Sequence, residues 1–194
     1  MSTEKANAQA HSGATVIRNS GHTEKAEAHG HYVVECYDKD GKLKWRDDIE
    51  NLIATVGKNL ALDSFLAGSS YSVTGPYIGL ISSTSYSAVN AADTMTSHAG
   101  WLEAGNANAP IYSGSRKTAA WSSASGGSKS LSAALSFSIT GSGTVKGCFM
   151  VFGSGASATV DNTSGTLYSA GLFTGGDKVV ANTDTLNVSF TASL

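Results

Sequence analysis

The sequence predicts a mainly all-β fold, an antiparallel jelly roll or β-sandwich with one short helix and an extended N-terminal arm. The composition favours strands and turns over helices, because only 14% of the 194 residues are charged and 22 are glycine. Apolar and polar residues alternate in several runs, and Gly/Ser-rich turns separate these runs. A parallel sheet would need helices between its strands, and the sequence indicates none there.

Residues 1–30 are expected to form the extended arm. The first 58 residues hold 17 of the 28 charged residues, and the apolar residues of the arm follow neither a strand nor a helix period. Segments of this kind commonly become ordered only against a partner. The apolar pair Val16 and Ile17 and the fork-shaped Arg18 are therefore candidate residues for contacts with a partner.

The β domain, residues 31–194, is expected to begin with a hairpin at 31–50. Its two strand-like runs, HYVVECYD and KLKWRDDI, are joined through an Asp-Gly pair, which is a good hairpin signal. Tyr32 and Trp45 are aromatic residues in polar surroundings, so we predict that they also contact a partner. A helix is predicted at about 54–67, from apolar residues three to five apart and a glycine where it would stop: Leu52, Ile53, Val56, Leu60, Phe65 and Gly68.

Beyond the helix the sequence predicts only strands. Alternation is clear near the middle, where one face of the strand would carry Leu131, Ala133, Leu135, Phe137 and Ile139. That face is expected in the core and the serines between these residues in solvent. The six runs are YIGLIS (77–82), IYSGSRKTAAW (111–121), KSLSAALSFSIT (129–140), TVKGCFMVFG (145–153), TLYSAGLF (166–173) and DTLNVSFTASL (184–194).

The stretch DTMTSHAGWLEA, residues 93–104, gathers the side chains that most suggest catalysis. Ser97 and His98 are adjacent, however, and neighbours in a strand point to opposite faces; no G-x-S-x-G turn accompanies them. Asp93 and Glu103 could pair across a glycosidase cleft, but Asp93 is more simply explained as a turn residue. We therefore expect no enzyme activity and no catalytic residues, with His98 left unexplained.

Metal and redox chemistry find little support. His29 and His31 would share one side of a strand and, with His22, could form a metal site between chains, although solvated histidines in a polar arm are the simpler interpretation. Cys36 and Cys148 form no C-x-x-C motif and are expected to be reduced packing residues. We expect no metal and no cofactor.

Aromatic residues, net charge and hydropathy limit the classes of partner that the sequence predicts. Trp101, Tyr112 and Trp121 could form a carbohydrate platform, but aromatic residues near strand ends more often pack over the core. A net charge of −2 and a pI near 6.2 predict no nucleic-acid partner and no anionic membrane partner. No apolar window is long enough to span a membrane, and the N-terminus lacks the apolar core of a signal peptide, so synthesis and folding in a cytosol are expected.

The order of motifs resembles a known family. NLIATVGKNLALDSFLAG is followed by YIGLIS, then ADTMTSHAGWLEA, YSGSRKTAAW, SFSITGSGTVKGCFMVFG and GTLYSAGLFTGGDKVVANTDTLNVSFTASL. This order resembles small virion structural proteins of tailed bacteriophages, which include jelly-roll capsid cement or decoration proteins. The similarity covers about residues 45–194 and rests on the order of the motifs rather than on any single one.

The resemblance implies a non-enzymatic protein on the virion capsid surface that bridges major capsid protein subunits and stabilises the shell. The implied partners are the major capsid protein and other copies of the chain, as a dimer or trimer. In such families the segment DTMTSHAGWLEA lies in a long loop without a known catalytic role. The alternative is a head-fibre or tail-fibre tip that binds a host-surface glycan, although the shaft sequence that would normally precede such a tip is absent.

Overall fold

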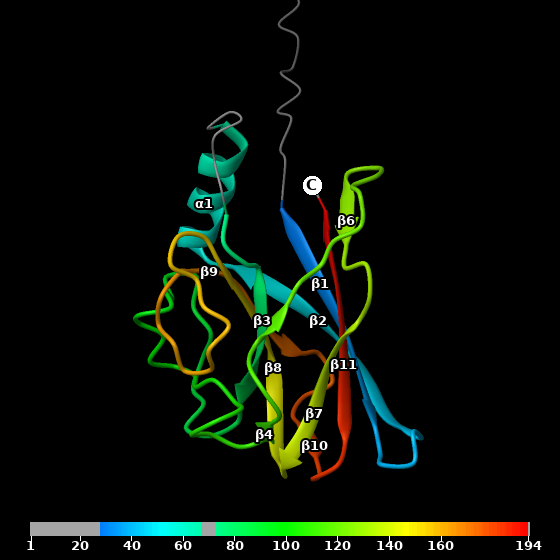
Figure 1. Ribbon diagram of the computed structural model, residues 1–194. Helices are drawn as coiled ribbons and strands as arrows, with labels where there is room; N and C mark the ends of the chain where they lie inside the picture. Colours follow the sequence, from blue (N-terminus) through cyan, green and yellow to red (C-terminus); the bar gives the residue numbers. More distant parts are fainter. Residues whose placement is uncertain (1–27, 67–72, 194) are drawn as a thin grey trace, which may run out of the picture.

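The computed structural model describes residues 28–66 and 73–193 and confirms a mainly antiparallel β fold with one short helix (Figure 1). The strands are β1 (His29–Tyr37), β2 (Leu43–Ile53), β3 (Tyr77–Ser82), β4 (Ile111–Tyr112), β5 (Lys117–Thr118), β6 (Ser128–Ser130), β7 (Leu135–Gly141), β8 (Gly143–Phe152), β9 (Thr166–Phe173), β10 (Lys178–Val180) and β11 (Thr185–Ser193). The helix α1 spans Thr55–Leu66. The arm residues Val16, Ile17 and Arg18 lie outside the described residues.

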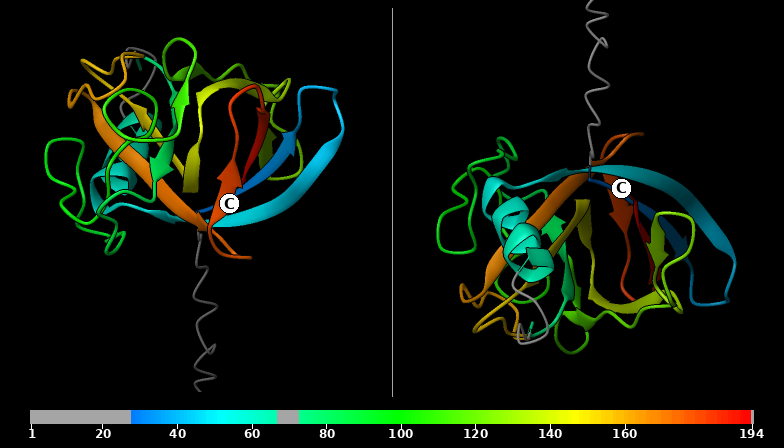
Figure 2. Two further views of the ribbon diagram at one scale, coloured as in Figure 1. Left: turned by 90° about the horizontal axis from the view of Figure 1, so that it is seen from below. Right: turned by 90° about the horizontal axis from the view of Figure 1, so that it is seen from above.

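All the strands join one continuous sheet in the order β4-β7-β11-β1-β2-β9-β8-β3-β5, with β10 added to β8 and β6 added to β11. The sheet curls into a half-barrel, so its two wings face each other like the layers of a sandwich (Figure 2). Both strands that end the order, β4 and β5, are two residues long. Such short edges offer little surface for pairing with another chain.

The predicted hairpin is confirmed as β1 and β2. Asp38 accepts hydrogen bonds from the backbone N–H groups of Asp40 and Lys42, and Gly41 adopts the positive φ of 76° that favours glycine in a tight turn. On its other side β1 pairs with β11, with His29 opposite Ser193. The start of β1, the end of β11 and α1 therefore lie at one end of the molecule, here called the α1 end; the β1–β2 turn and β10 lie at the opposite, hairpin end (Figure 1).

Tyr32 is a correction to the predicted contact residues. It is 0% exposed, its ring packs against Phe190 with centroids 4.5 Å apart, and its hydroxyl lies 3.3 Å from the Ser169 Oγ. The cause is the alternation of β1, in which Tyr32, Val34 and Cys36 all point into the half-barrel. A buried side chain cannot contact a partner, so the prediction for Tyr32 was wrong.

Trp45, the other aromatic contact residue predicted from the hairpin, is half-buried. Its ring packs edge-on against Phe173 at 5.5 Å, and its Nε1 donates to the Val179 carbonyl at 3.2 Å. Leu43 in β2 and Val179 in β10, by contrast, expose 47% and 68% of their surface. Leu43, Trp45 and Val179 are here called the hairpin-end apolar residues.

The central strands β3 and β8 are buried on both faces, which explains their continuous apolar runs. Residues such as Ile78, Leu80 and Met150 point into the half-barrel core. Ile81 and Phe149 point the other way, into a second core covered by the loops between β3 and β4 and between β8 and β9. This second core positions the stretch 93–104.

Two predicted strands are broken and one strand was missed. The run 111–121 forms only β4 and β5, and 129–140 forms β6 and β7, with Ala133 exposed between them rather than in the core. The three-residue β10 was not predicted because it is too short to show a period. In α1 the inward face carries Gly57 and Leu60, whereas Phe65, predicted on that face, is 82% exposed.

Candidate functional site

The stretch 93–104 lies in the loop layer over the second core, where Trp101 is its anchor. Trp101 is 0% exposed and packs on Phe149, with ring centroids 5.1 Å apart. Its Nε1 donates a 3.0 Å hydrogen bond to the Asp93 carboxylate, which also accepts one from the Asn90 backbone N–H at 2.9 Å. Asp93 therefore closes a turn and binds the indole that holds the loop down.

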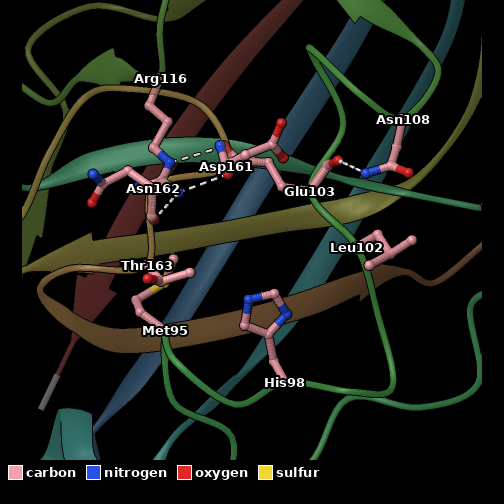
Figure 3. Close-up of a pocket in the computed structure, with 9 residues that line it drawn as sticks. All are labelled: Met95, His98, Leu102, Glu103, Asn108, Arg116, Asp161, Asn162 and Thr163. Carbon is pink, nitrogen blue, oxygen red and sulfur yellow. Dashed lines mark hydrogen bonds and ion pairs between the residues drawn. The ribbon is translucent and has the colours of Figure 1, made fainter.

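His98 is held against the same indole. Its ring stacks on Trp101 with centroids 4.0 Å apart and planes 23° from parallel, and its Nδ1 lies 3.0 Å from the Trp101 carbonyl oxygen. Because a carbonyl only accepts, Nδ1 carries the hydrogen in this contact. The same ring helps to line a pocket (Figure 3).

Next to this pocket lies a buried ion pair. Arg116, 2% exposed, donates from Nε and Nη2 to the two carboxylate oxygens of Glu103, at 2.8 and 2.6 Å. The backbone N–H of Asp161 adds a third donor to Glu103, at 2.8 Å. All three hydrogen bonds are charge-assisted, the stronger kind in proteins.

The remaining donors of Arg116 reach a different loop. Nη1 donates to the Ser157 carbonyl at 3.0 Å, and Nη2 donates to the Asn162 carbonyl at 2.7 Å. The guanidinium also lies over the Phe149 ring, 5.3 Å from its centroid. Arg116 thus ties its own loop to the loop before β4 and the loop before β9, three segments without a regular ladder between them.

The electrostatics of the pair follow from burial. Desolvation raises the pKa of the Glu103 carboxyl above its usual value, and the Arg116 guanidinium and the Asp161 amide offset this only in part. Breaking the pair would leave a charge without a partner in this environment. Its evident role is to fix loop positions.

The pocket itself is small, about 100 Å³, and mixed in character. Its polar groups are largely committed to the protein: besides the Glu103–Arg116 pair, the Asn108 side chain donates to the Glu103 carbonyl at 3.0 Å. Figure 3 shows the ion pair on one side and His98 on the other. The lining residues are Met95, His98, Leu102, Glu103, Asn108, Arg116, Asp161, Asn162 and Thr163.

The candidate catalytic residues are not assembled into a reactive group. The His98 Nδ1 contacts the Trp101 carbonyl, and Ser97 lies exposed in a turn where its backbone N–H donates to the Thr94 hydroxyl. Asp93 and Glu103 have different partners, the Trp101 indole and the Arg116 guanidinium respectively. The hydrogen bonds of these side chains hold loops in place.

The aromatic platform is also absent from the surface. Trp101 and Tyr112 are 0% and 2% exposed, so the carbohydrate interpretation was wrong for both. Trp121 is half-buried and packs edge-on against Phe190 at 5.9 Å. These residues pack over the two cores, as the simpler interpretation predicted.

The histidines and cysteines were the other candidates. No three His, Cys, Asp or Glu side chains within residues 28–66 and 73–193 could together hold a metal ion. His31 lies 3.5 Å from Asp48, and His22 is outside the described residues. Cys36 and Cys148 are both free and buried, as expected, and burial raises the pKa of the Cys36 thiol to about 12.

Sequence reasoning missed Arg116, the centre of this arrangement. A usable signal was present: Arg116 is the only arginine after residue 46, in a part of the chain where charges are rare. An isolated guanidinium among Ser, Gly and Ala is a candidate for burial against a carboxylate, because arginine rarely becomes buried without a partner. The partner, 13 residues earlier in another loop, follows no period.

The comparisons with known proteins add no relative. No family model, no curated protein and no solved structure matches the chain. Among the described residues, no helix has the length and apolar character needed to cross a membrane.

Proposed function

We propose that the chain is a non-enzymatic virion structural protein that binds the outside of a bacteriophage capsid. There it would bridge major capsid protein subunits, as a cement or decoration protein. The observation that carries this proposal is the use of the stretch 93–104. Asp93 and Glu103 are the buried side chains of this stretch that could have served catalysis. Both instead hold loops in place, through hydrogen bonds to Trp101 and Arg116 respectively.

A rigid loop layer suits a clamp. A shell under pressure from packaged DNA is stabilised by protein that adds buried interface where capsomers would part, and rigid surfaces lose less entropy on binding. The Arg116 contacts and the Trp101 anchor supply that rigidity in this chain. The motif order over residues 45–194, which resembles small tailed-phage virion proteins, points to the same function.

The hairpin-end apolar residues are the part of the described surface that we assign to the capsid contact. Tryptophan is enriched at binding hot spots. The Trp45 indole is already held in place by the Phe173 ring and by the Val179 carbonyl. Leu43 and Val179 beside it are exposed. The described chain begins with β1 at the opposite end (Figure 1), and the predicted contact residues Val16, Ile17 and Arg18 precede it in the sequence.

Co-sedimentation with purified capsids tests the proposal. A cement protein is expected at a copy number near that of the major capsid protein. A handful of copies per particle would contradict cement and favour the glycan-binding fibre tip. Binding of labelled cell-surface glycan by the free protein would point the same way.

Two variants locate the contact. Val179→Ser should weaken capsid binding while leaving the thermal unfolding temperature nearly unchanged, because the side chain is 68% exposed. Leu52→Ser in the last residues of β2 before α1, 41% exposed, is the matched control and should bind capsids normally. Equal binding by both variants and the parent chain would remove the hairpin end from the capsid contact.

A further inference from the structure

The outward face of α1 is apolar where a surface helix is usually polar. Leu62, Phe65 and Leu66 expose 57%, 82% and 73% of their surface. They stand at i, i+3 and i+4, so they form one contiguous stripe on the helix. The stripe is not needed for the core, because α1 packs through Gly57 and Leu60 instead.

A charge accompanies the stripe. Asp63 is exposed next to Leu62 and makes no ion pair with any residue of 28–66 or 73–193. An occupant of this face would therefore be expected to offer large apolar side chains followed by a cation.

The chain carries such a segment itself. Within residues 1–27 the only adjacent pair of large apolar residues is Val16 and Ile17, and Arg18 follows directly. That segment joins the described chain at the α1 end: Gly30 packs against the side chain of Asn51, four residues before α1 begins at Thr55. Figure 1 shows the start of β1 and α1 at the same end.

The chain between Ile17 and β1 is long enough to place Ile17 on the outward face of α1. The eleven residue-to-residue steps from Ile17 to Ala28 can span up to about 36 Å when extended. The helix α1, with 12 residues, is about 18 Å long. The segment around Ile17 can therefore reach the far turn of α1, where the stripe lies.

We infer that residues 15–18 dock on the outward face of α1, with Val16 and Ile17 on Leu62, Phe65 and Leu66 and Arg18 beside Asp63. This goes beyond the proposed function, because it concerns the free protein. It gives the N-terminal segment a defined binding site on the chain. A capsid that needs the segment would have to compete with that site.

Photo-cross-linking of the full chain tests the inference. The substitution Phe65→p-benzoylphenylalanine keeps an aromatic ring at the exposed position. After irradiation and trypsin digestion we expect an adduct with residues 6–18, the fragment between Lys5 and Arg18. Adducts within one copy or between two copies both place the segment on α1.

The same cross-linker at Val179 is the control, since Val179 is comparably exposed but lies at the hairpin end. Asp63→Lys should reduce the adduct at position 65. Combining it with Arg18→Glu should restore the adduct, then found in the longer fragment that ends at Lys25. Absence of residues 6–18 from the adducts, or equal yields at positions 65 and 179, overturns the inference.

Capsids do not enter this measurement. If the cross-link is not found, the proposal that the protein binds capsids is unaffected. If the protein does not bind capsids, the cross-link can still form. The two outcomes are therefore read separately.

Discussion

Arg116 and Glu103 meet side-on through two parallel hydrogen bonds of 2.8 and 2.6 Å, with the Arg116 side chain fully shielded from solvent. We expect Arg116→Met to cost about 3–5 kcal/mol of unfolding free energy, because it leaves the Glu103 carboxylate buried without its cation. Urea unfolding measures the loss. The double variant Arg116→Met with Glu103→Leu should recover part of it, and a single variant as stable as the parent would show that the pair contributes little.

Asp47 makes stability depend on acid. Burial raises the pKa of this carboxyl, but hydrogen bonds from Lys178, Thr174 and the Asp48 backbone N–H lower it more, so the pKa lies below its usual value. The stabilisation is therefore present above the unfolded pKa of about 3.9 and is lost as the pH falls through the lower folded pKa.

The test is Asp47→Asn, unfolded in urea from pH 7 to pH 3. Its deficit relative to the parent should be constant near neutrality and shrink in acid. Asp177→Asn is the matched control, because the ion pair of Asp177 with Lys146 is half exposed and should contribute little. A deficit for Asp47→Asn that grows in acid would contradict the assigned direction.

Asn51 is a buried amide whose nitrogen and oxygen both lack a hydrogen-bond partner among the described residues. We expect Asn51→Leu, which keeps the branched shape, to raise the unfolding free energy by about 1–3 kcal/mol by removing unsatisfied polar atoms. Gly30→Ala should act in the opposite direction, since a Cβ there would lie 2.5 Å from the Asn51 Oδ1. Thermal unfolding of both variants decides, and a destabilised Asn51→Leu would mean that the amide is paired after all.

Trp101 contributes through its nitrogen as well as its ring. Trp101→Phe keeps an aromatic ring on Phe149 but leaves the buried Asp93 carboxylate without the indole donor, at an expected cost of about 1–3 kcal/mol. Trp45→Phe loses a comparable hydrogen bond, to the Val179 carbonyl, at the surface and should cost less. Equal losses of unfolding free energy in the two variants would contradict the role given to burial.

Much of the fold could be predicted because its strands carry their own periods. YIGLIS coincides with β3 and TLYSAGLF with β9, and the Asp-Gly pair marks the hairpin turn. The prediction that Phe65 lies on the inward face of α1 was wrong for a geometric reason. Five residues after Leu60 a helix has turned by about 140° from that face. The prediction that Ala133 lies on the core face of a strand was wrong because this residue belongs to the connection between β6 and β7 and not to a strand.

The candidate site could be predicted only in part. The packing of Trp101 over a core and the place of Asp93 in a turn follow from local chemistry and are confirmed. The role of Glu103 depends on Arg116, and the two meet only because separate loops fold over one face of β3 and β8. No local pattern encodes a contact of that kind.

The pairing of His29 with Ser193 has a practical side. A peptide or reporter attached before β1 or after β11 would emerge from one pole of the protein, away from the surface formed by Leu43, Trp45 and Val179. If that surface seats the protein on a shell, cargo joined at the start of β1 or at the end of β11 would point in a common direction, and a particle could carry two different passengers per copy.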